Sequence, residues 1–351
     1  MLEKVCHIGP GFAVQGGISS VLVSYKKLFN LSKTNFISSY NGSFLKSIPL
    51  LLKTCFKILF KKNHNFEIFQ IHTSTYGSFF RKFIISLCLR VKKEKYVAHI
   101  HGSIFKKFCS SSPKLIQFFI RSYLKKAEVI ICITPDMQEF LDNFIGKDTC
   151  KFSIIPNPCE NIAENPIDLA QHTLPVKIVF SGRYGKRKGV YDLIEAFDKT
   201  DFDFPTELYL FGDGETEKVR QTVATKSKAN LIHVSDWLTH KEYLDNLIQY
   251  DILALPSYAE TFGMSLVEAM GNGIPVISTF SGGVPYVVEN NTTGFLNAPG
   301  DIEALSKSIK KLVNNKDLRI AMGKSAWEHT KSHFSGPVIL KKLNSLYQEL
   351  L

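Results

Sequence analysis

The stretch Ser257–Val276 reads SYAETFGMSLVEAMGNGIPV, which predicts a loop, a helix and a strand in succession. A turn at Thr261–Gly263 leads into a helical pattern, and glycines close that pattern before a β-like run begins at Pro275. Two carboxylates, Glu260 and Glu268, lie eight residues apart across the turn. Eight residues of helix rise about 12 Å, farther than the ~5 to 9.5 Å between the paired carboxylates of glycosidases. The two acids therefore favour a long ligand that is held at two points.

The start of the predicted helix, near Gly263 and Ser265, presents backbone N–H groups and the positive end of the helix dipole between the two acids. These groups bind phosphate readily. A nucleotide-sugar has a matching layout, with hydroxyl groups at both ends and a diphosphate between them. The alternative interpretation is a buried helix whose acids form structural salt bridges.

This segment resembles the donor-site signature of family 4 glycosyltransferases, which are retaining enzymes of the GT-B fold. The resemblance implies that Glu260 contacts the donor sugar and that Glu268 contacts the ribose. It implies a nucleotide diphosphate sugar as co-substrate, with no other cofactor. It also implies that the diphosphate contacts the loop and helix-start residues Thr261, Phe262, Gly263, Met264 and Ser265.

A second segment, Phe180–Gly189, ends a predicted strand with a glycine-rich turn that carries four cations. Open α/β sheets bind ligands at the carboxyl ends of their strands, where a guanidinium or an ammonium can neutralise phosphate. We expect Arg183 and Lys188 to hold the diphosphate, with Gly182 in the same donor site. The two cations match the Gly-Arg and Lys-Gly positions at which the family stabilises the leaving group. A solvated basic turn is the alternative.

Gly212, Asp213 and Gly214 follow another predicted strand. They also resemble the family, which implies that they line the nucleotide side of the donor site. In the first half of the chain, Gly16 and Gly17 lie between the first predicted strand and the first helix. Because they lack side chains, this loop can approach a diphosphate or an acceptor closely, and it matches the N-terminal Gly-Gly of the family.

The neighbouring segment Gly9–Gly11 suggests a dinucleotide fingerprint, but Val14 stands at the third glycine position. This departure disfavours a hydride-transfer enzyme.

His101 follows the predicted strand Tyr96–Ile100 and precedes Gly102. A neutral imidazole there can hydrogen bond to a sugar hydroxyl, and the resemblance implies that it contacts the donor sugar. A structural histidine is the alternative. His99 shares the strand face with His101, but no third ligand of suitable spacing is evident, so we predict no metal there.

Asp201 and Asp203 form a DxD pair, which other glycosyltransferases use to hold a divalent ion. The pair lies on the amino side of the next predicted strand, away from the expected site. We therefore expect a solvent-exposed loop and transfer without an obligatory metal.

Short apolar runs alternate with helical patterns along the 351 residues, which predicts an α/β protein with parallel sheets. The runs comprise residues 5–8, 66–72, 96–101, 129–134, 153–155, 176–181, 208–212, 231–233, 252–255, 275–278 and 294–296.

We expect the GT-B architecture, in which two Rossmann-like parallel-sheet domains face each other across a cleft. Residues 1–160 form the acceptor-side domain, and residues 170–335 form the nucleotide-sugar donor domain. Residues 336–351 form a C-terminal helix that crosses back to the first domain. The proline-containing stretch 157–175 is the predicted linker.

The net charge of +11 is concentrated in the first part of the chain. Residues 1–160 hold 23 Lys and Arg against 9 Asp and Glu, whereas residues 161–351 hold 20 against 23. Lys53, Lys57 and Lys61 follow one face of a predicted amphipathic helix, with Leu52 and Phe56 on the opposite face. This pattern favours contact with an anionic membrane surface. The alternative is that the apolar face packs on the sheet and the lysines are simply solvated.

Seven scattered cysteines without Cys-x-x-Cys spacing disfavour disulfides and a zinc site, and a reducing cytosol fits them best. No run of eighteen apolar residues occurs. We therefore predict a cytoplasmic protein that is peripheral on the inner face of the cell membrane.

These observations predict a retaining glycosyltransferase of the hexosyltransferase type, which moves a sugar from a nucleotide diphosphate sugar to a glycan acceptor. A lipid-linked acceptor in the synthesis of bacterial lipopolysaccharide, capsule or exopolysaccharide is favoured. Alternatives are a glycosyltransferase with a soluble small-molecule acceptor, a non-catalytic sugar-nucleotide binder and a nucleic-acid-binding protein. The basic helices lack a recognisable nucleic-acid recognition motif, so no nucleic-acid partner is expected.

Overall fold

The computed structural model describes residues 2–14, 16–60, 66–102 and 104–351. Lys61 of the predicted basic helix lies outside these residues. The chain divides into two compact units. Unit 1 comprises Met1–Pro158 together with Gly336–Leu351, and unit 2 comprises Cys159–Ser335.

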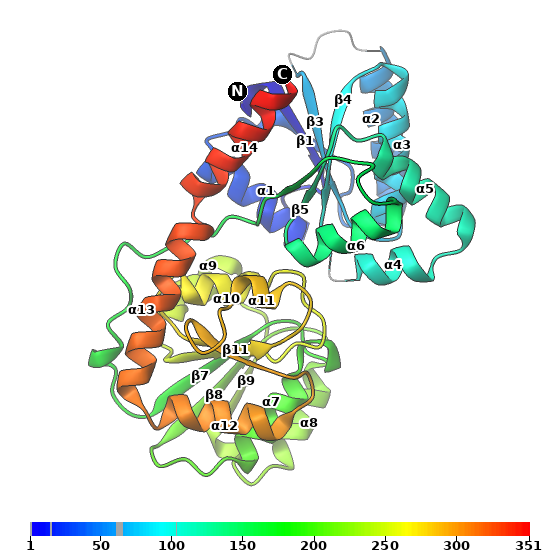
Figure 1. Cartoon of the computed structure of the whole chain (residues 1–351). Coiled ribbons are helices and arrows are strands. Elements are labelled where there is room, and N and C mark those ends of the chain that lie inside the picture. Colours follow the sequence, from blue (N-terminus) through cyan, green and yellow to red (C-terminus); the bar gives the residue numbers. More distant parts are fainter. Residues whose placement is uncertain (1, 15, 61–65, 103) are drawn as a thin grey trace. The chain divides into compact units, whose positions relative to one another are not determined.

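Unit 1 contains a six-stranded sheet in the order β2-β1-β3-β4-β5-β6, and every neighbouring pair is parallel (Figure 1). Branched and aromatic residues fill the central strands, which suits a sheet that is buried on both faces. The strands are β1 (Val5–Gly9), β2 (Phe36–Ser38), β3 (Ile68–Thr73), β4 (Lys95–Ile100), β5 (Val129–Cys132) and β6 (Phe152–Ile154).

Helices cover both faces of this sheet. The core on one face takes side chains from α2 to α6, whereas the core on the other face takes Val21 and Tyr25 of α1 with Ile339, Leu343 and Tyr347 of α14. The C-terminal helix is therefore part of the core of unit 1. The helices are α1 (Gly17–Leu28), α2 (Phe44–Phe60), α3 (Gly77–Val91), α4 (Phe105–Ser111), α5 (Lys114–Lys125), α6 (Pro135–Ile145) and α14 (Gly336–Leu350).

Unit 2 contains a second six-stranded parallel sheet in the order β12-β11-β10-β7-β8-β9 (Figure 1). Its strands are β7 (Val176–Ser181), β8 (Thr206–Phe211), β9 (Ile232–Ser235), β10 (Ile252–Ala254), β11 (Val276–Thr279) and β12 (Gly294–Asn297). Its helices are α7 (Val190–Lys199), α8 (Thr216–Ala224), α9 (His240–Leu247), α10 (Met264–Met270), α11 (Val284–Val287), α12 (Ile302–Val313) and α13 (Lys316–His333).

Both sheets confirm the predicted α/β class with Rossmann-like parallel sheets. Each predicted apolar run overlaps a strand, and β2 is a strand that the sequence analysis missed. Phe36–Ser38 is too short to show an alternating pattern.

Each sheet has a point at which the strand order reverses. In unit 1 this point lies between β1 and β3, because β2 is on the other side of β1. In unit 2 it lies between β7 and β10, because β8 is on the other side of β7. The loops that leave two such strands diverge to opposite faces, which opens a crevice at their carboxyl ends where open α/β sheets bind ligands.

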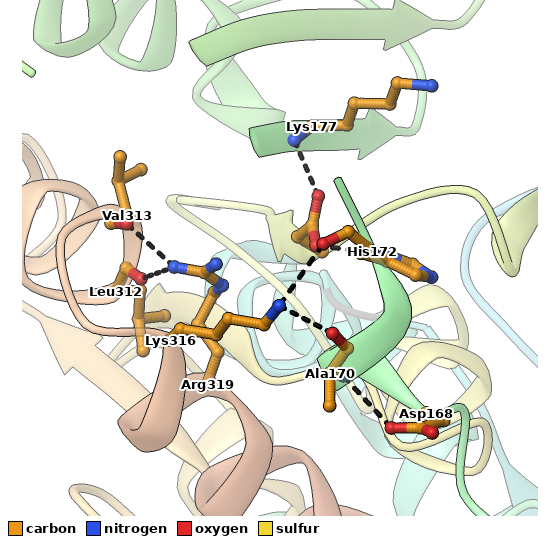
Figure 2. A network of polar contacts seen from close by, with 9 residues as sticks. Asp168, Ala170, His172, Lys177, Leu312, Val313, Lys316 and Arg319 are labelled. Atoms are coloured by element: carbon orange, nitrogen blue, oxygen red, sulfur yellow. Dashed lines mark hydrogen bonds and ion pairs between the residues drawn. The ribbon is translucent and has the colours of Figure 1, made fainter. Parts of the chain in front are cut away.

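A polar network around Asp251 fixes the amino ends of β7 and β10. Figure 2 shows most of the residues of this network. The Asp251 carboxylate accepts hydrogen bonds from His172 Nδ1 at 3.0 Å and from the Lys177 backbone N–H at 2.8 Å. Lys316 Nζ donates to the carbonyl of Ala170 at 2.6 Å and contacts that of His172 at 3.4 Å. The stretch that the sequence predicts as a linker is thus attached to unit 2, at the edge of the sheet opposite the ligand-binding edge.

Within the described residues, the structure contains no helix that combines the length and apolar character needed to cross a bilayer.

Candidate functional site

The loops after β7 and β8 are held together by their backbones. The Tyr184 N–H donates to the Asp213 carbonyl at 2.6 Å. A Cβ at Gly212 would lie 2.2 Å from the Gly182 carbonyl oxygen, so this approach requires a glycine. The exposed Arg183 side chain lies over Gly214, where an added Cβ would be 3.2 Å from Arg183 Cγ. The predicted residues of these two loops therefore form one continuous surface.

The loop after β7 also packs against the loop after β10. The Tyr258 N–H donates to the Arg187 carbonyl at 2.9 Å. Gly189 has φ of +72°, and a Cβ there would lie 2.0 Å from the Pro256 carbonyl oxygen. Only glycine fits this conformation and this approach. The contact places Lys188 beside the loop that carries Glu260.

Lys188 and Glu260 form an ion pair at this junction. The two side chains are 16% and 12% exposed, so water screens the pair less than a surface salt bridge. The other Glu260 oxygen, Oε1, accepts a hydrogen bond from the Thr261 N–H at 3.0 Å. The Gly283 N–H donates to the Glu260 carbonyl at 3.2 Å. Glu260 is therefore held by three loops, its carboxylate by Lys188 and the Thr261 N–H and its backbone by Gly283.

The turn at Thr261–Gly263 leads into α10, as the sequence indicated. Gly263, with φ of +80°, is the residue before the helix. Met264 and Ser265 are half-buried at its start, where the first N–H groups have no partner within the helix. Phe262 is 2% exposed and packs edge-on against Phe334, with ring centroids 5.3 Å apart. Its side chain anchors the loop, so Phe262 offers a ligand its backbone only.

Glu268 lies on α10 and is buried, with 7% exposure. Burial raises the pKa of its carboxyl group, whereas the hydrogen bond and charge of His240 lower it. His240 Nε2 lies 2.8 Å from Glu268 Oε1. His240 begins α9, where Thr239 and Glu242 form a capping box that fixes the start of the helix. The sequence analysis missed His240, although the Thr-x-x-Glu pattern at residues 239–242 marks the helix start that positions it.

Gly16 and Gly17 belong to unit 1, as does His101, whereas the other predicted site residues belong to unit 2. Both glycines are exposed at the start of α1, and a Cβ at either would meet no atom within 4 Å. Gly16 has φ of +144°, which only glycine adopts readily. The space beside this loop is open to a ligand.

His101 is buried, with 4% exposure, and belongs to a hydrogen-bonded network of imidazoles. Tyr347 donates to Gln70 Oε1, so the Gln70 amide nitrogen donates to His99 Nδ1 at 2.8 Å and faces His72 Nε2 at 3.4 Å. Because an amide nitrogen can only donate, His72 Nε2 accepts, and the proton of a neutral His72 is on Nδ1. His72 Nδ1 therefore donates to His101 Nε2 at 3.1 Å. This order leaves the proton of a neutral His101 on Nδ1, from which it can donate to a hydroxyl.

Burial keeps these imidazoles neutral. It lowers the pKa of His101 to about 3, and it lowers the pKa of His72 and His99 well below the ordinary histidine value. His7, whose Nδ1 lies 3.2 Å from His72 Nε2, has its pKa lowered to about 3 for the same reason. His101 therefore acts as a neutral hydrogen-bonding group over the physiological pH range.

The statement that His99 and His101 lack a third partner is wrong. His72 of β3 lies next to them, and ligand atoms of the three histidines lie within 4.8 Å of one another. The spacing of 27 residues between His72 and His99 hid this neighbour, because only the pairing of β3 with β4 brings the two positions side by side. Hydrogen bonds already engage these imidazoles, and the absence of a metal there remains a prediction.

The DxD pair lies in the connection between α7 and β8, at the amino side of β8. Asp203 accepts a hydrogen bond from Asn314 Nδ2 at 2.6 Å. The donor-site candidates of unit 2 lie at the carboxyl ends of the strands, so the pair is at the opposite edge of the sheet.

Comparison with known proteins agrees with this description. Residues 162–329 match the family model for glycosyl transferases group 1. The chain is 29% identical over 179 residues to N-acetyl-alpha-D-glucosaminyl L-malate synthase of Bacillus anthracis, covering 50% of this chain and 45% of that protein. It is 29% identical over 181 residues to the capsular polysaccharide biosynthesis glycosyltransferase CapM of Staphylococcus aureus, covering 50% of this chain and 46% of that protein. The matches thus span about half the length of these curated relatives.

The fold extends the likeness to the whole chain. HepE of Anabaena, solved in complex with UDP, matches with a TM-score of 0.78 and 16% identity, covering 99% of this chain and 100% of that one. The two Rossmann-like units define a protein of the GT-B fold. The resemblance to group 1 glycosyl transferases lies in unit 2, which carries the residues that match the family model.

Proposed function

We propose that the protein is a retaining glycosyltransferase that transfers a hexosyl group from a nucleotide diphosphate sugar to a glycan acceptor. The observation that carries the proposal is the Lys188–Glu260 ion pair at the point where the strand order of unit 2 reverses. An ammonium for the diphosphate and a carboxylate for the sugar hydroxyls lie side by side there. HepE in complex with UDP supports a nucleotide donor, and retention follows the resemblance to family 4.

In this proposal Arg183 and Lys188 neutralise the departing diphosphate. Glu260 orients the donor sugar through its hydroxyl groups, and Glu268 binds the ribose from its buried position beside His240. Gly182, Gly212, Asp213 and Gly214 line the nucleotide side, and the N–H groups at the start of α10 face the phosphates. His101 of unit 1 donates from Nδ1 to a sugar hydroxyl. Most of the rate enhancement comes from positioning and electrostatic stabilisation of the leaving group.

The acceptor attacks the anomeric carbon on the face from which the diphosphate leaves, and a phosphate oxygen takes the acceptor proton. The new glycosidic bond forms as the bond to the diphosphate breaks, so the anomeric configuration is retained. The cations of unit 2 replace a divalent ion in this scheme. Transfer should therefore persist in the presence of EDTA.

The test is transfer by the Glu260→Ala variant, after thermal-shift screening with UDP, GDP and ADP has identified the donor base. At 100 times its dissociation constant a specific nucleotide stabilises the protein by about 2.7 kcal/mol. Glu260→Ala should abolish transfer, whereas Glu303→Ala, which removes an exposed acid paired with Lys307, should not. Normal transfer by Glu260→Ala would refute the role of Glu260. Nucleotide binding without transfer by the wild type to any acceptor would favour a non-catalytic binder.

We further propose that the acceptor is lipid-linked and that unit 1 lies on the inner face of the cell membrane. The relative CapM is named for capsular polysaccharide biosynthesis. On α2 the outward side chains form an apolar stripe, and Lys53 and Lys57 are exposed beside it. The stripe consists of Ile48, Leu52, Phe56 and Phe60, which are 46%, 65%, 60% and 69% exposed.

The sheet-facing side of α2 is formed by Thr54 and Ile58 instead, which are 2% exposed. The apolar stripe therefore does not pack on the sheet. The adjoining helix α3 exposes a second stripe, made of Phe80, Ile84, Leu87 and Val91. Exposed apolar side chains flanked by lysines suit an anionic bilayer, where each cation contributes about 1 kcal/mol.

Sedimentation with vesicles tests this surface. The wild type should sediment with vesicles that contain an anionic phospholipid and much less with neutral ones. The double variant Leu52→Glu/Phe56→Glu should stay in solution, whereas Ile248→Glu, at a similarly exposed apolar position of unit 2, should sediment like the wild type. If the wild type does not sediment with anionic vesicles, a soluble small-molecule acceptor becomes the better proposal.

A further inference from the structure

Unit 1 contains a cavity of about 270 Å³ at the point where its own strand order reverses. The loop after β1 and the start of α1 form one wall, with Gly16, Gly17 and Ser19. The loop after β3 and the start of α3 form the other wall, with Ser78, Arg81 and Lys82 among the lining residues. The volume is just below the ~300–1,000 Å³ of typical small-molecule sites, so it suits one part of a larger ligand.

The α1 wall presents hydrogen-bond donors. Gly16 provides no side-chain cap, and the first N–H groups of α1 have no partner within the helix. Ser19 is 3% exposed, and its buried hydroxyl has no hydrogen-bond partner among the described residues. A buried hydroxyl without a partner is costly, and a ligand acceptor would satisfy it.

The α3 wall presents cations. Lys82 is 1% exposed, and its Nζ donates to Ser78 Oγ at 3.1 Å. The Ser74 N–H also donates to Ser78 Oγ at 3.3 Å, which leaves the Ser78 proton available to a ligand. Arg81 lies over the Tyr40 ring at 4.6 Å, and its Nε has no hydrogen-bond partner in the part of the chain that the structure describes. None of the described residues that line the cavity is acidic.

The cavity adjoins His101. Ser74 lines the cavity, and its Oγ lies 2.7 Å from the position of a Cβ added to Gly102. Besides burial, the charge of Lys82 lowers the pKa of His101, and Lys82 also lines the cavity. A ligand in this cavity is therefore near the imidazole that we assign to a sugar hydroxyl.

We propose that this cavity binds an oxyanion of the acceptor, a phosphate group by preference, through Lys82, Arg81, Ser19 and the start of α1. The inference rests on the proposed transferase function and specifies the acceptor as a phosphorylated or similarly anionic molecule. The described residues that line this cavity all belong to unit 1, whereas the proposed diphosphate site belongs to unit 2. Every group that we place on it donates a hydrogen bond, which is the complement of a phosphate.

The state of Lys82 supports this assignment. Burial, with the charge of Arg81, lowers the pKa of the Lys82 ammonium to about 7. A buried ammonium with one serine as partner destabilises the fold and is retained where a ligand needs it. An anion beside Lys82 would favour the charged form and raise its pKa again. Arg81 on the same helix and the neutral His72 and His101 on the sheet are the charged and titratable groups near Lys82.

The test is calorimetric titration of the full chain with inorganic phosphate at constant ionic strength, with chloride as the reference anion. Saturating nucleoside diphosphate is present, so that the unit 2 site is already occupied. The wild type should bind phosphate under these conditions. Lys82→Met and Ser19→Ala should weaken phosphate binding, by about 10- to 100-fold for the lysine. Lys107→Met, which removes an exposed lysine of the same unit, should bind phosphate like the wild type.

A Lys188→Met variant separates the two possible sources of the phosphate. If the cavity serves the acceptor, phosphate still binds to this variant with wild-type affinity, even though its nucleotide site is damaged. Lys82→Met removes a buried charge and should fold at least as well as the wild type. The inference is overturned if the wild type does not bind phosphate or if Lys82→Met and Ser19→Ala bind it normally. It is also overturned if nucleoside diphosphate displaces the phosphate, because the cavity would then hold the donor. None of these results depends on observing transfer, so failure here is distinct from failure of the proposed function.

Discussion

In both units the candidate site lies where the strand order of the parallel sheet reverses, but the lysines at the two sites have different partners. In unit 2 the site lysine faces an acid, Lys188 with Glu260, and His240 lies against Glu268. In unit 1 the buried Lys82 donates to a serine, and His72 lies between two other imidazoles. Unit 2 thus holds in place the Glu260 carboxylate, which we propose to bind the donor sugar. Unit 1 keeps hydrogen-bond donors and a buried cation that have no anionic partner among the residues that the structure describes.

The different partners of the two lysines suit the two sites to different kinds of ligand. A nucleotide-sugar has anionic and hydroxylated parts, and a mixed site of cations and carboxylates complements both. A site of donors alone complements an anion and disfavours a neutral ligand, since its buried polar groups would stay unpaired.

Acid should unfold unit 1 before unit 2. His7 and His101 have a pKa of about 3 in the fold, against an ordinary value of 6.5, so the unfolded chain takes up protons that the fold does not. The stability of unit 1 is therefore full above pH 6.5 and falls as the pH decreases toward 3. Each such histidine contributes at most about 1.4 kcal/mol per pH unit. With His72 and His99 included, the total loss at pH 5 is several kcal/mol.

The two tryptophans allow a direct measurement of this order. Trp237 and Trp327 both belong to unit 2. In an acid titration, far-UV circular dichroism should lose part of its signal before the tryptophan emission changes. Coincident transitions would show that the histidine network does not set the acid stability of unit 1.

Lys188→Ala should lower kcat/KM for transfer by about 100- to 1,000-fold, the usual loss when one preorganised group for the leaving charge is removed. Lys199→Ala, which removes an exposed lysine paired with Glu195 on α7, should leave kcat/KM within about twofold, since exposed pairs contribute little. Equal effects of the two variants would break the assignment of Lys188 to the diphosphate.

Lys82→Met should stabilise unit 1 most at low pH. The fold lowers the pKa of Lys82 from 10.5 to about 7, so the destabilisation by its charge is complete below pH 7 and fades as the pH rises toward 10.5. The free energy of unfolding of the wild type should therefore rise with pH in this window, by at most about 1.4 kcal/mol per unit. Urea unfolding at pH 6.5 and pH 8.5 measures the difference from the variant. A difference that does not shrink between these pH values would show that Lys82 is not held in a charge-disfavouring site.

Tyr347→Phe should destabilise unit 1 by about 1 to 2 kcal/mol, because it removes the buried hydrogen bond from α14 to Gln70. Tyr76→Phe, at a tyrosine that is 56% exposed, should change the free energy of unfolding by less than about 0.5 kcal/mol. Chemical denaturation followed by circular dichroism measures both. If the two changes are equal, the Tyr347 contact does not contribute to the stability of unit 1.

The sequence sufficed for the strands and for the residues that follow them. Buried parallel strands are continuous apolar runs, and glycine with a cation at the end of such a run, as at Gly182 and Arg183, is a local pattern. Lys188 is predicted from this pattern, whereas Glu260 is predicted from the loop and helix pattern of Ser257–Val276. Their ion pair could not be foreseen, because it depends on the pairing of β7 with β10, in which Ile178 pairs with Ile252, 74 residues away in the sequence.

The residues that the sequence analysis missed also owe their position to contacts between elements that are distant in the sequence. His72 follows no glycine pattern, and it joins His101 only through the register of β3 and β4. Lys82 belongs to a helix in which lysine usually faces solvent, and its burial depends on the packing of α3 against the sheet. For α2 the sequence left open whether the apolar face with Leu52 and Phe56 packs on the sheet, and in the structure both are exposed while Ile58 is buried. Helical periodicity predicts an apolar face but does not say what covers it.

The most direct measurement is the titration of the wild type, Lys188→Met and Lys82→Met with UDP, GDP and ADP. We predict that at least one of these nucleotides binds the wild type, that Lys188→Met loses that binding and that Lys82→Met keeps it. If none of the three nucleotides binds, or if Lys82→Met loses the binding and Lys188→Met keeps it, the central claim that unit 2 holds the nucleotide-sugar is contradicted.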